Sequence, residues 1–345
     1  MGIDIRTAVP NGGAAASESP TGDLTRDQPI AVTTTLSDLP TILMIVRAGR
    51  STIHPSWIYT AAPHVDVALS VYDESDFSQH PIVKQHFASC GKLQGIKAFF
   101  DSHPQVAESY DYFWIFDDDL YLPHETILMV RRLLALFRFA VAAPALSHTS
   151  FFSWPINIRN DRLLFRGTDF VEIMAPIMSR EFLTTCLPHF EENHSGWGHE
   201  WLWRRFLQEK KQFAAILDAA PIVHTRPFGR GPIYKDRPAG CADPHIERDQ
   251  LISKFALDPG VAFRNQFGVT AGPLPRLLTG VDLTQEMLCG YKALLRHNQG
   301  ALLCCLDYLL KHGPIATIED LRMLLGFDLI ESYVRSGTSA AALLM

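Results

Sequence analysis

Short hydrophobic runs alternate along the chain with amphipathic segments of helical spacing. The runs TILMIVRAG from Thr41, VDVALSVYD from Val65 and DYFWIF from Asp111 have the length and composition of strands that are buried on both faces of a sheet. The segment ETILMVRRLLALFRF, Glu125–Phe139, instead repeats its hydrophobic residues at the period of an amphipathic helix. Strands that alternate with helices predict an α/β fold, with a mostly parallel sheet covered by helices on both faces.

The same alternation continues further along the chain. DFVEIMAPIMS, Asp169–Ser179, is strand-like, and Ser179 is suited to cap the helix that follows. GHEWLWRRFLQEKK, Gly198–Lys211, predicts a helix, and FAAILDAAPIVH, Phe213–His224, predicts a strand that ends on a histidine.

The pattern divides the chain into three parts. Residues 1–38 are rich in Ala, Gly, Ser, Thr and Pro without hydrophobic periodicity, which predicts a disordered segment. Residues 39–265 hold the strand and helix pattern and predict one α/β domain. Residues 266–345 predict a linker, PLPRLLTGVDL, and a small helical region without a catalytic constellation. The helices expected there are Thr284–His297, Gly300–His312 and Ile318–Leu325.

Composition narrows the class of protein. The chain has 345 residues and a net charge of −6, so nothing favours a nucleic-acid partner. Its six cysteines form no CxxC pair, which favours reduced thiols in a cytoplasmic protein. We find neither the pattern of a secretory signal nor an apolar run of the roughly 18 residues that span a bilayer. Peripheral membrane association and the oligomeric state stay open.

Three consecutive aspartates, Asp117–Asp119, follow the strand DYFWIF directly. Ligands of open α/β sheets bind at the carboxyl ends of the strands, where this turn is expected to lie. Carboxylate oxygens suit Mn²⁺ or Mg²⁺, which bind one or two carboxylates together with substrate phosphates. Such a cation would offset the repulsion among the aspartates. The alternative is a solvated acidic turn that caps the next helix.

His224 ends the last predicted strand of the same sheet, where a neutral imidazole could complete a metal site with Asp117 and Asp119. A structural histidine is the alternative. Arg226 follows two residues later and has the geometry to bind phosphate oxygens, unless it is a plain surface arginine.

A second polar group precedes the helix at Gly198. In SGWGHEW, Trp197 offers an indole face for a sugar ring, and Glu200 would lie in the first helical turn, where the helix dipole favours its ionised form. An ionised carboxylate beside an acceptor hydroxyl is a candidate general base. Glu172, within an otherwise apolar strand, needs a partner or a purpose, so acceptor binding and a structural salt bridge are both open.

In this order, these pieces resemble a GT-A-type glycosyltransferase, whose Rossmann-like sheet carries a D-x-D metal motif after a central strand. The resemblance places the motif on Asp117 and Asp119 and the downstream metal ligand on His224. GWGHE also resembles the GWGGED stretch of inverting β-galactosyltransferases, in which the aspartate after the glutamate is the base. Trp201 stands at that place here, so the base role would fall to Glu200.

The chain is also similar to the domain of unknown function 707 family. The similarity runs roughly from Leu43 to Pro227, through VRAGRSTIHPSW, YDYFWIFDDDLYL, FVEIMAPIMSRE, GWGHEW and IVHTRP. It implies nucleotide contacts after the first two strands and on the next helix, each with helix capping or surface polarity as the alternative. Those residues are Arg47, Ser51, His54, Asp73 and Lys97.

The leading hypothesis is a metal-dependent glycosyltransferase. It would move a sugar from a UDP- or GDP-sugar to a hydroxyl of a carbohydrate or glycan, with inversion. One alternative is a non-catalytic protein on the same frame that binds carbohydrate or a nucleotide sugar. Another is a metal-dependent phosphotransferase, although Tyr121 replaces the threonine of its usual aspartate motif. The donor, the acceptor and the choice between retention and inversion stay open.

Overall fold

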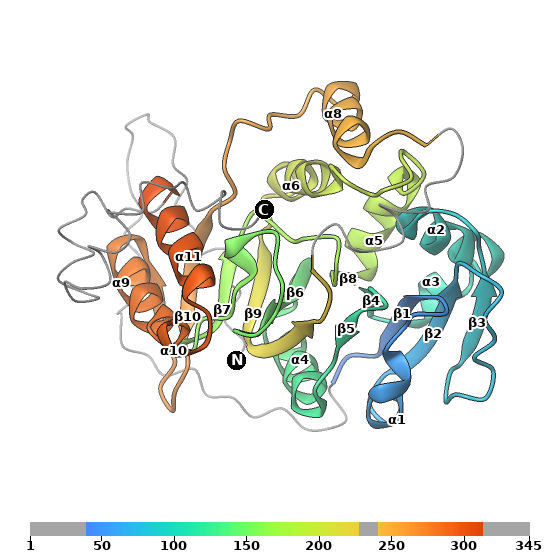
Figure 1. Cartoon of the computed structure of the whole chain (residues 1–345), viewed down its shortest axis with the longest axis horizontal. Coiled ribbons are helices and arrows are strands. Elements are labelled where there is room, and N and C mark those ends of the chain that lie inside the picture. The colour runs from blue at the N-terminus through green and yellow to red at the C-terminus, as the bar shows by residue number, and fades with distance from the viewer. Residues whose placement is uncertain (1–38, 228–240, 313–345) are drawn as a thin grey trace, which may run out of the picture.

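The computed structural model describes residues 39–227 and 241–312. The predicted disordered segment 1–38 and the predicted helix Ile318–Leu325 lie outside the described residues. The described part of the chain builds one large sheet with helices on both sides (Figure 1).

Eleven strands of the described residues form the sheet. Ten of them lie side by side in the order β11-β10-β7-β9-β6-β8-β4-β1-β2-β3, and β5 pairs with β9. The strands are β1 (Ile42–Ala48), β2 (Asp66–Val71), β3 (Lys84–Phe87), β4 (Tyr112–Phe116), β5 (Leu120–Tyr121), β6 (Val141–Leu146), β7 (Leu163–Thr168), β8 (Ile177–Ser179), β9 (Ala214–His224), β10 (Asn265–Thr270) and β11 (Leu277–Thr279).

The sheet is mixed, whereas the sequence pattern predicted a mostly parallel one. Strands β3, β2, β1 and β4 are parallel neighbours, and so are β6 and β9. The short strand β8 lies between β4 and β6 and is antiparallel to both. Strands β7, β10 and β11 then extend the sheet with antiparallel pairs. The prediction failed because strand direction depends on partners that are distant in sequence.

Helices flank the strands. They are α1 (Ile58–Ala61), α2 (Lys92–Ser102), α3 (Val106–Ser109), α4 (His124–Phe137), α5 (Arg180–Cys186), α6 (His199–Glu209), α8 (Pro244–Lys254), α9 (Gly280–Tyr291), α10 (Leu294–His297) and α11 (Gln299–His312), with short 3-10 turns at η3 (His54–Ser56), η4 (Pro155–Asn157) and η5 (Leu187–His189). As predicted, Ser179 caps α5, and its side chain accepts a hydrogen bond from the Phe182 amide.

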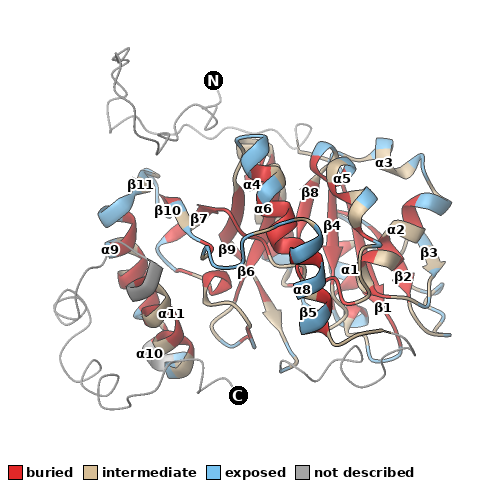
Figure 2. Ribbon diagram, turned by 90° about the horizontal axis from the view of Figure 1, so that it is seen from above, coloured by how far each residue is buried: buried red, intermediate tan, exposed pale blue. Residues whose placement is uncertain are grey.

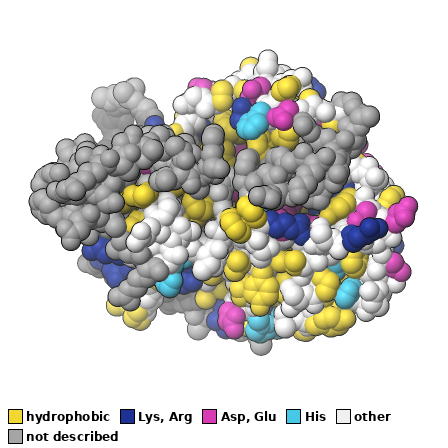
Figure 3. All heavy atoms as spheres, in the orientation of Figure 1, with side chains coloured by type: hydrophobic (Ala, Val, Ile, Leu, Met, Phe, Trp, Pro, Cys, Tyr) yellow, Lys and Arg dark blue, Asp and Glu magenta, His cyan; other side chains and the backbone are white. Residues whose placement is uncertain are grey.

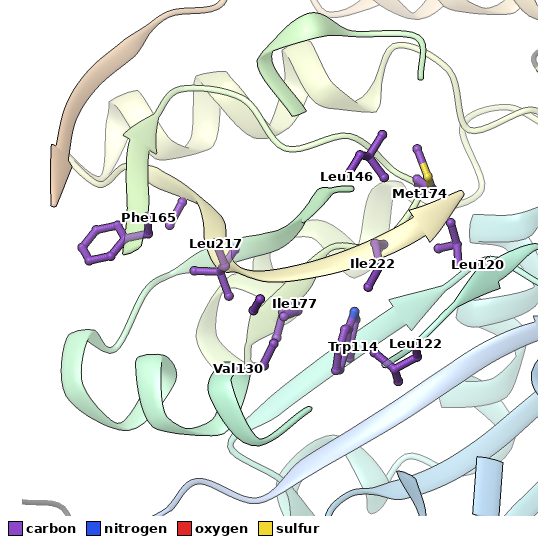
Figure 4. Packing of buried hydrophobic residues seen from close by; sticks show 14 of the residues in the cluster. Trp114, Leu120, Leu122, Val130, Leu146, Phe165, Met174, Ile177, Leu217 and Ile222 are labelled. Atoms are coloured by element: carbon purple, nitrogen blue, oxygen red, sulfur yellow. The ribbon is translucent and has the colours of Figure 1, made fainter. Parts of the chain in front are cut away.

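Alternate residues of the central strands serve two cores. In β1, Met44 and Val46 pack in a core with residues of α1, α4, α9 and α11. Leu43 and Ile45 of the same strand pack instead with residues of α2, α5 and α6. Figure 2 shows the buried strands between helices whose outer faces are exposed, and Figure 4 shows Trp114 of β4 within the first core. Because both faces are covered, polar side chains collect where the strands end.

The C-terminal part of the described chain joins this sheet. Strand β10 pairs with β7, and β11 lies within the stretch PLPRLLTGVDL that the sequence analysis interpreted as a linker. Helices α9 and α11 contribute Met287 and Leu302, among others, to the first core. The region that was expected to be a small helical appendage therefore also supplies two strands and packs on the α/β domain.

Three further observations concern the described part of the chain. No helix among the described residues is long and apolar enough to cross a membrane. All six cysteines are free thiols. On the face in Figure 3, the described charged side chains of both signs are interspersed and do not gather into one basic patch.

Candidate functional site

Loops from three strands meet around the aspartate turn. The amide of Ile53, after β1, donates to the Asp118 carbonyl at 2.8 Å, and the amide of Thr225, after β9, donates to the Asp119 carbonyl at 3.1 Å. Leu120 pairs with His224 in the β5–β9 ladder. Backbone bonds thus bring the predicted aspartates and the predicted histidine to one place, at the ends of β4 and β9.

Asp117 has its own cationic partner. The Lys92 ammonium, in the first turn of α2, lies 2.7 Å from Asp117 Oδ1. The Asp117 amide donates to the Met174 carbonyl at 3.2 Å. Burial raises the pKa of the Asp117 carboxyl, and the charge of Asp119 adds to this, while the charge of Lys92 acts in the opposite direction.

Asp118 and Asp119 have different partners. The Tyr72 hydroxyl donates to Asp118 Oδ2 at 2.6 Å, and Arg226 Nη1 donates to Asp118 Oδ1 at 3.0 Å. Asp119 Oδ2 lies 3.4 Å from His224 Nε2 and 3.9 Å from Arg226 Nη1. Each aspartate therefore faces a cationic side chain of the protein, which offsets part of the repulsion within the turn.

These contacts separate the pKa values of the last two aspartates. Burial raises the pKa of the Asp118 carboxyl to about 6. Burial acts on Asp119 too, but the hydrogen bond and charge of His224, together with Arg226, lower the pKa of that carboxyl overall. Burial acts to lower the pKa of His224, yet the Asp119 carboxylate outweighs it and raises the pKa of the imidazole. Asp119 is therefore the member of the turn that stays ionised most readily.

The residues around Asp119 supply some of the ligands that a divalent cation needs. Among residues 39–227 and 241–312, no three His, Cys, Asp or Glu side chains are placed to hold a metal ion together. Asp119 Oδ2 and His224 Nε2 face each other at 3.4 Å, which gives one oxygen and one nitrogen ligand. Mg²⁺ and related cations usually take few protein ligands and fill the rest with phosphate oxygens and water, so this pair suits an ion that arrives with a diphosphate.

Two further carboxyls lie near the turn. Glu200, in the first turn of α6, is buried, and its Oε2 accepts a hydrogen bond from the Gly198 amide at 3.2 Å. Burial raises the pKa of Glu200 to about 7. Glu172 is half-buried and accepts a hydrogen bond from Asn157 Nδ2. Burial raises the pKa of Glu172 to about 8, and the charge of Glu200 adds to the effect. Such a shift near neutral pH is typical of acid–base groups.

The loop before α6 has the backbone that its glycines allow. Gly196 and Gly198 have φ angles of 77° and 96°, in the left-handed region that side chains with a Cβ disfavour. Trp197 between them is half-buried, and its ring meets the His245 ring of α8 edge-on at 4.9 Å. The glycines thus set the position of Trp197 and the start of the helix that carries Glu200.

The predicted nucleotide contacts divide into two groups. The Ser51 carbonyl accepts a hydrogen bond from Arg226 Nη2, so both residues lie beside the aspartate turn. Asp73 accepts a hydrogen bond from the Arg50 amide at 2.7 Å and so shapes the loop after β1.

The other three predicted contacts have partners elsewhere. Arg47 is buried and donates to Ser70 and to the carbonyls of Ala88 and Cys90. Lys97 forms an ion pair with Asp101 on α2 at 2.6 Å. His54, the remaining residue of that group, is fully buried, and Thr52 Oγ1 lies 2.8 Å from its Nδ1.

Sequence reasoning missed Lys92 and Tyr72, although both touch the aspartates. A signal existed for Lys92, because it follows Gly91 at the start of the segment GKLQGIKAFF, whose hydrophobic residues have helical spacing. The helix dipole disfavours a cation in the first turn, so a lysine there calls for an anionic partner. Tyr72 precedes Asp73 at the end of β2, and nothing in its local pattern distinguishes it from a core aromatic residue.

No protein-family model matches the chain, and no curated protein matches it. Among solved structures, the chain is similar to a crystal structure of GalNAc-T7 with UDP, GalNAc and Mn²⁺, at 9% sequence identity and a TM-score of 0.45. The match covers 63% of this chain and 49% of that one, so the chain spans about half the length of its structural neighbour. The resemblance to the domain of unknown function 707 family stays a prediction.

Proposed function

We propose that the protein is a metal-dependent glycosyltransferase that uses a nucleotide-diphosphate sugar. The observation that carries the proposal is the pairing of Asp119 with His224 close to half-buried Glu172 and buried Glu200, where the loops after β1, β4 and β9 meet. A divalent cation can stabilise a departing diphosphate, and a carboxyl of near-neutral pKa can act as a general base toward an acceptor hydroxyl.

The donor side would be formed by the aspartate turn. Asp119 and His224 would hold Mn²⁺ or Mg²⁺, with Asp117 as the predicted further ligand. A bound divalent cation would supply positive charge to the departing diphosphate. Arg226 lies within 3.0 Å of Asp118 and adds a guanidinium suited to phosphate oxygens.

The acceptor side would be formed by Glu200, Glu172 and Trp197. Glu200 takes the proton of the acceptor hydroxyl, and the acceptor oxygen forms a bond to the anomeric carbon. The bond from that carbon to the phosphate oxygen breaks, and its electron pair leaves with the nucleoside diphosphate. Displacement in a single step inverts the anomeric centre. Trp197 offers a flat apolar surface to a sugar ring, and Glu172 a polar group beside it.

The test uses the purified full chain with UDP- and GDP-sugars, with Mn²⁺, Mg²⁺ or EDTA. We expect sugar transfer or slow donor hydrolysis that needs the cation and falls at least about 100-fold in Asp119→Asn. Because the pKa of Glu200 is raised to about 7, the rate should rise with pH between about 6 and 8. Glu200→Gln should lower the rate and abolish that rise. Absence of binding and turnover for every donor, with no effect of Asp119→Asn, would refute the proposal.

One observation favours a second candidate, a non-catalytic protein that binds a nucleotide sugar. Every aspartate of the turn already faces a cationic side chain, namely Lys92 for Asp117 and Arg226 for Asp118 and Asp119. Tight binding of a nucleotide sugar without turnover, equal in the native chain and in Glu200→Gln, would favour this candidate.

A further inference from the structure

Lys92 is a buried cation whose hydrogen-bonding capacity is fully used. Its side chain is 9% exposed. An ammonium group has three donors, and three acceptors surround it. They are Asp117 Oδ1 at 2.7 Å, the Met174 carbonyl at 2.9 Å and the Ile173 carbonyl. Lys92 thus joins α2, the end of β4 and the segment before β8.

The position of Lys92 is unfavourable without these partners. A cation in the first turn of a helix opposes the helix dipole, and burying an ammonium group costs free energy unless it is paired. The backbone at this point is also held closely. A Cβ at Gly91, the residue that caps α2, would lie 1.9 Å from the His194 carbonyl oxygen. This contact fixes Lys92 against the loop that leads to Trp197 and Glu200.

The backbone of one residue, Ile173, lies between Lys92 and the proposed base. The Ile173 carbonyl accepts from Lys92, and the Ile173 amide lies close enough to the Glu200 carboxyl to lower its pKa. The Asp117 amide donates to the next carbonyl, that of Met174, at 3.2 Å. A continuous set of contacts therefore runs from Asp117 through Lys92 and the Ile173 backbone to Glu200.

We propose that Lys92 is a positioning residue. Through the Ile173–Met174 backbone, it holds the Glu200 carboxyl at a fixed position relative to the aspartate turn. The role of Glu200 as a base rests on the proposed function, but the link between Lys92 and Glu200 does not. Lys92 acts through its neighbours and does not itself need to touch substrate.

The link has a measurable consequence at Glu200. Charged groups near this carboxyl include Lys92 from α2, whose charge lowers its pKa, and Glu172 from the segment before β8. The charge of Lys92 and the Ile173 amide both lower the pKa of Glu200, against the larger effect of burial. Removing the ammonium takes away its charge and releases the Ile173 peptide, so the pKa of Glu200 should move upward.

The experiment measures the Glu200 titration directly, without any substrate. Glutamate is labelled with ¹³C at its carboxyl carbon, and Glu200→Gln assigns the signal. We compare the native chain with Lys92→Met, which removes the charge at similar length, and Lys92→Arg, which keeps it. The matched control is Lys210→Met, which breaks a partly exposed ion pair with Glu181 at the end of α6.

We expect the pKa of Glu200 to rise by about one unit in Lys92→Met, to recover at least half of that change in Lys92→Arg, and to stay unchanged in Lys210→Met. An unchanged Glu200 titration in folded Lys92→Met would overturn the proposal. If Lys92→Met does not fold, Lys92→Gln takes its place, because the amide keeps a donor for the carbonyls. A shifted titration with no turnover of any nucleotide sugar would sustain the Lys92 link and reject the glycosyltransferase.

Discussion

At the scale of single residues, three adjacent aspartates have three different surroundings. Asp117 pairs with Lys92, Asp118 with Tyr72 and Arg226, and Asp119 with His224. Three residues of the same type therefore have different hydrogen-bonding and charged partners in the folded protein. Their separate partners make it possible to test each aspartate alone.

Asp119→Asn should mainly lower ligand affinity, whereas Asp118→Asn should mainly lower folding stability. Asp119→Asn removes the carboxylate opposite His224, so we expect the affinity for UDP with Mn²⁺ to fall at least about tenfold. Asp118→Asn should weaken that affinity much less, because its carboxylate is occupied by Tyr72 and Arg226. Loss of that pairing should instead lower the melting temperature. Calorimetric titration and thermal unfolding measure the two effects, and equal losses of affinity would contradict the assignment.

The carboxyls of Glu172 and Glu200 should make folding stability depend on pH. The pKa values of Glu172 and Glu200 are raised to about 8 and about 7, above those of unfolded glutamate. The folded protein thus binds these protons more tightly. Their contribution to stability is complete below about pH 4.5 and is lost as the pH rises through 7 to 8.

Glu172→Gln removes one of these groups and keeps an oxygen for Asn157. We expect the variant to melt about 2 to 4 °C higher than the native chain at pH 9, with a smaller or reversed difference at pH 5. Thermal unfolding at the two pH values measures this. An equal stabilisation at pH 5 and pH 9 would show that the carboxyl is ionised at both pH values.

At the scale of elements, local pattern predicted those whose core-facing residues are hydrophobic. The strand expected at DYFWIF is β4, Tyr112–Phe116, and the helix expected at Glu125–Phe139 is α4, His124–Phe137. Strand β7 was missed because its sequence LLFRGT includes Arg166 and Gly167, which are unusual inside a sheet. Both residues are accommodated by partners that are distant in sequence. Asp218 forms an ion pair with Arg166. A Cβ at position 167 would lie 2.2 Å from the Phe267 ring, so the glycine leaves room for that ring.

The start of α2 depends on one glycine. A Cβ at Gly91 would lie 1.9 Å from a backbone oxygen, which cannot rotate away, so Gly91→Ala should destabilise the protein by about 1 to 3 kcal/mol. It should also displace Lys92. The control is Gly300→Ala in α11, where the nearest atom to a new Cβ is 3.6 Å away and little change is expected. Denaturant unfolding compares them, and equal stability of the two variants would show that the α2 contact relaxes freely.

At the scale of the whole molecule, the candidate site was more predictable than the architecture around it. That Asp119 and His224 lie together could be predicted from their places at strand ends, because parallel strands end at one edge of a sheet, while their role as metal ligands stays a prediction. Lys92 and Tyr72 were not found, since a partner in space leaves little trace in a single sequence. The sequence also did not predict that the C-terminal strands pair with the sheet and that the C-terminal helices pack on it, for the same reason.

A buried ion pair makes it possible to test whether the C-terminal helices share one core with the sheet. Arg166 of β7 donates to both carboxylate oxygens of Asp218 in β9 at 2.9 Å, and its Nη1 lies 3.3 Å from the Tyr291 hydroxyl of α9. The side chains of Arg166 and Asp218 are 0% exposed. Asp218→Asn would leave a buried guanidinium without its counter-charge, and breaking such a pair costs about 3 to 5 kcal/mol.

The matched control spans the same two regions at the surface. Arg162 and Glu286 of α9 form an ion pair at 2.6 Å, in which the arginine side chain is 57% exposed, so Arg162→Gln should cost no more than about 1 kcal/mol. If β7, β9 and α9 share one core, Asp218→Asn should lower a single unfolding transition and weaken hydrogen-exchange protection in α9 together with the sheet. A second transition, with α9 unaffected, would instead show that the C-terminal helices fold separately from the strands that carry the site.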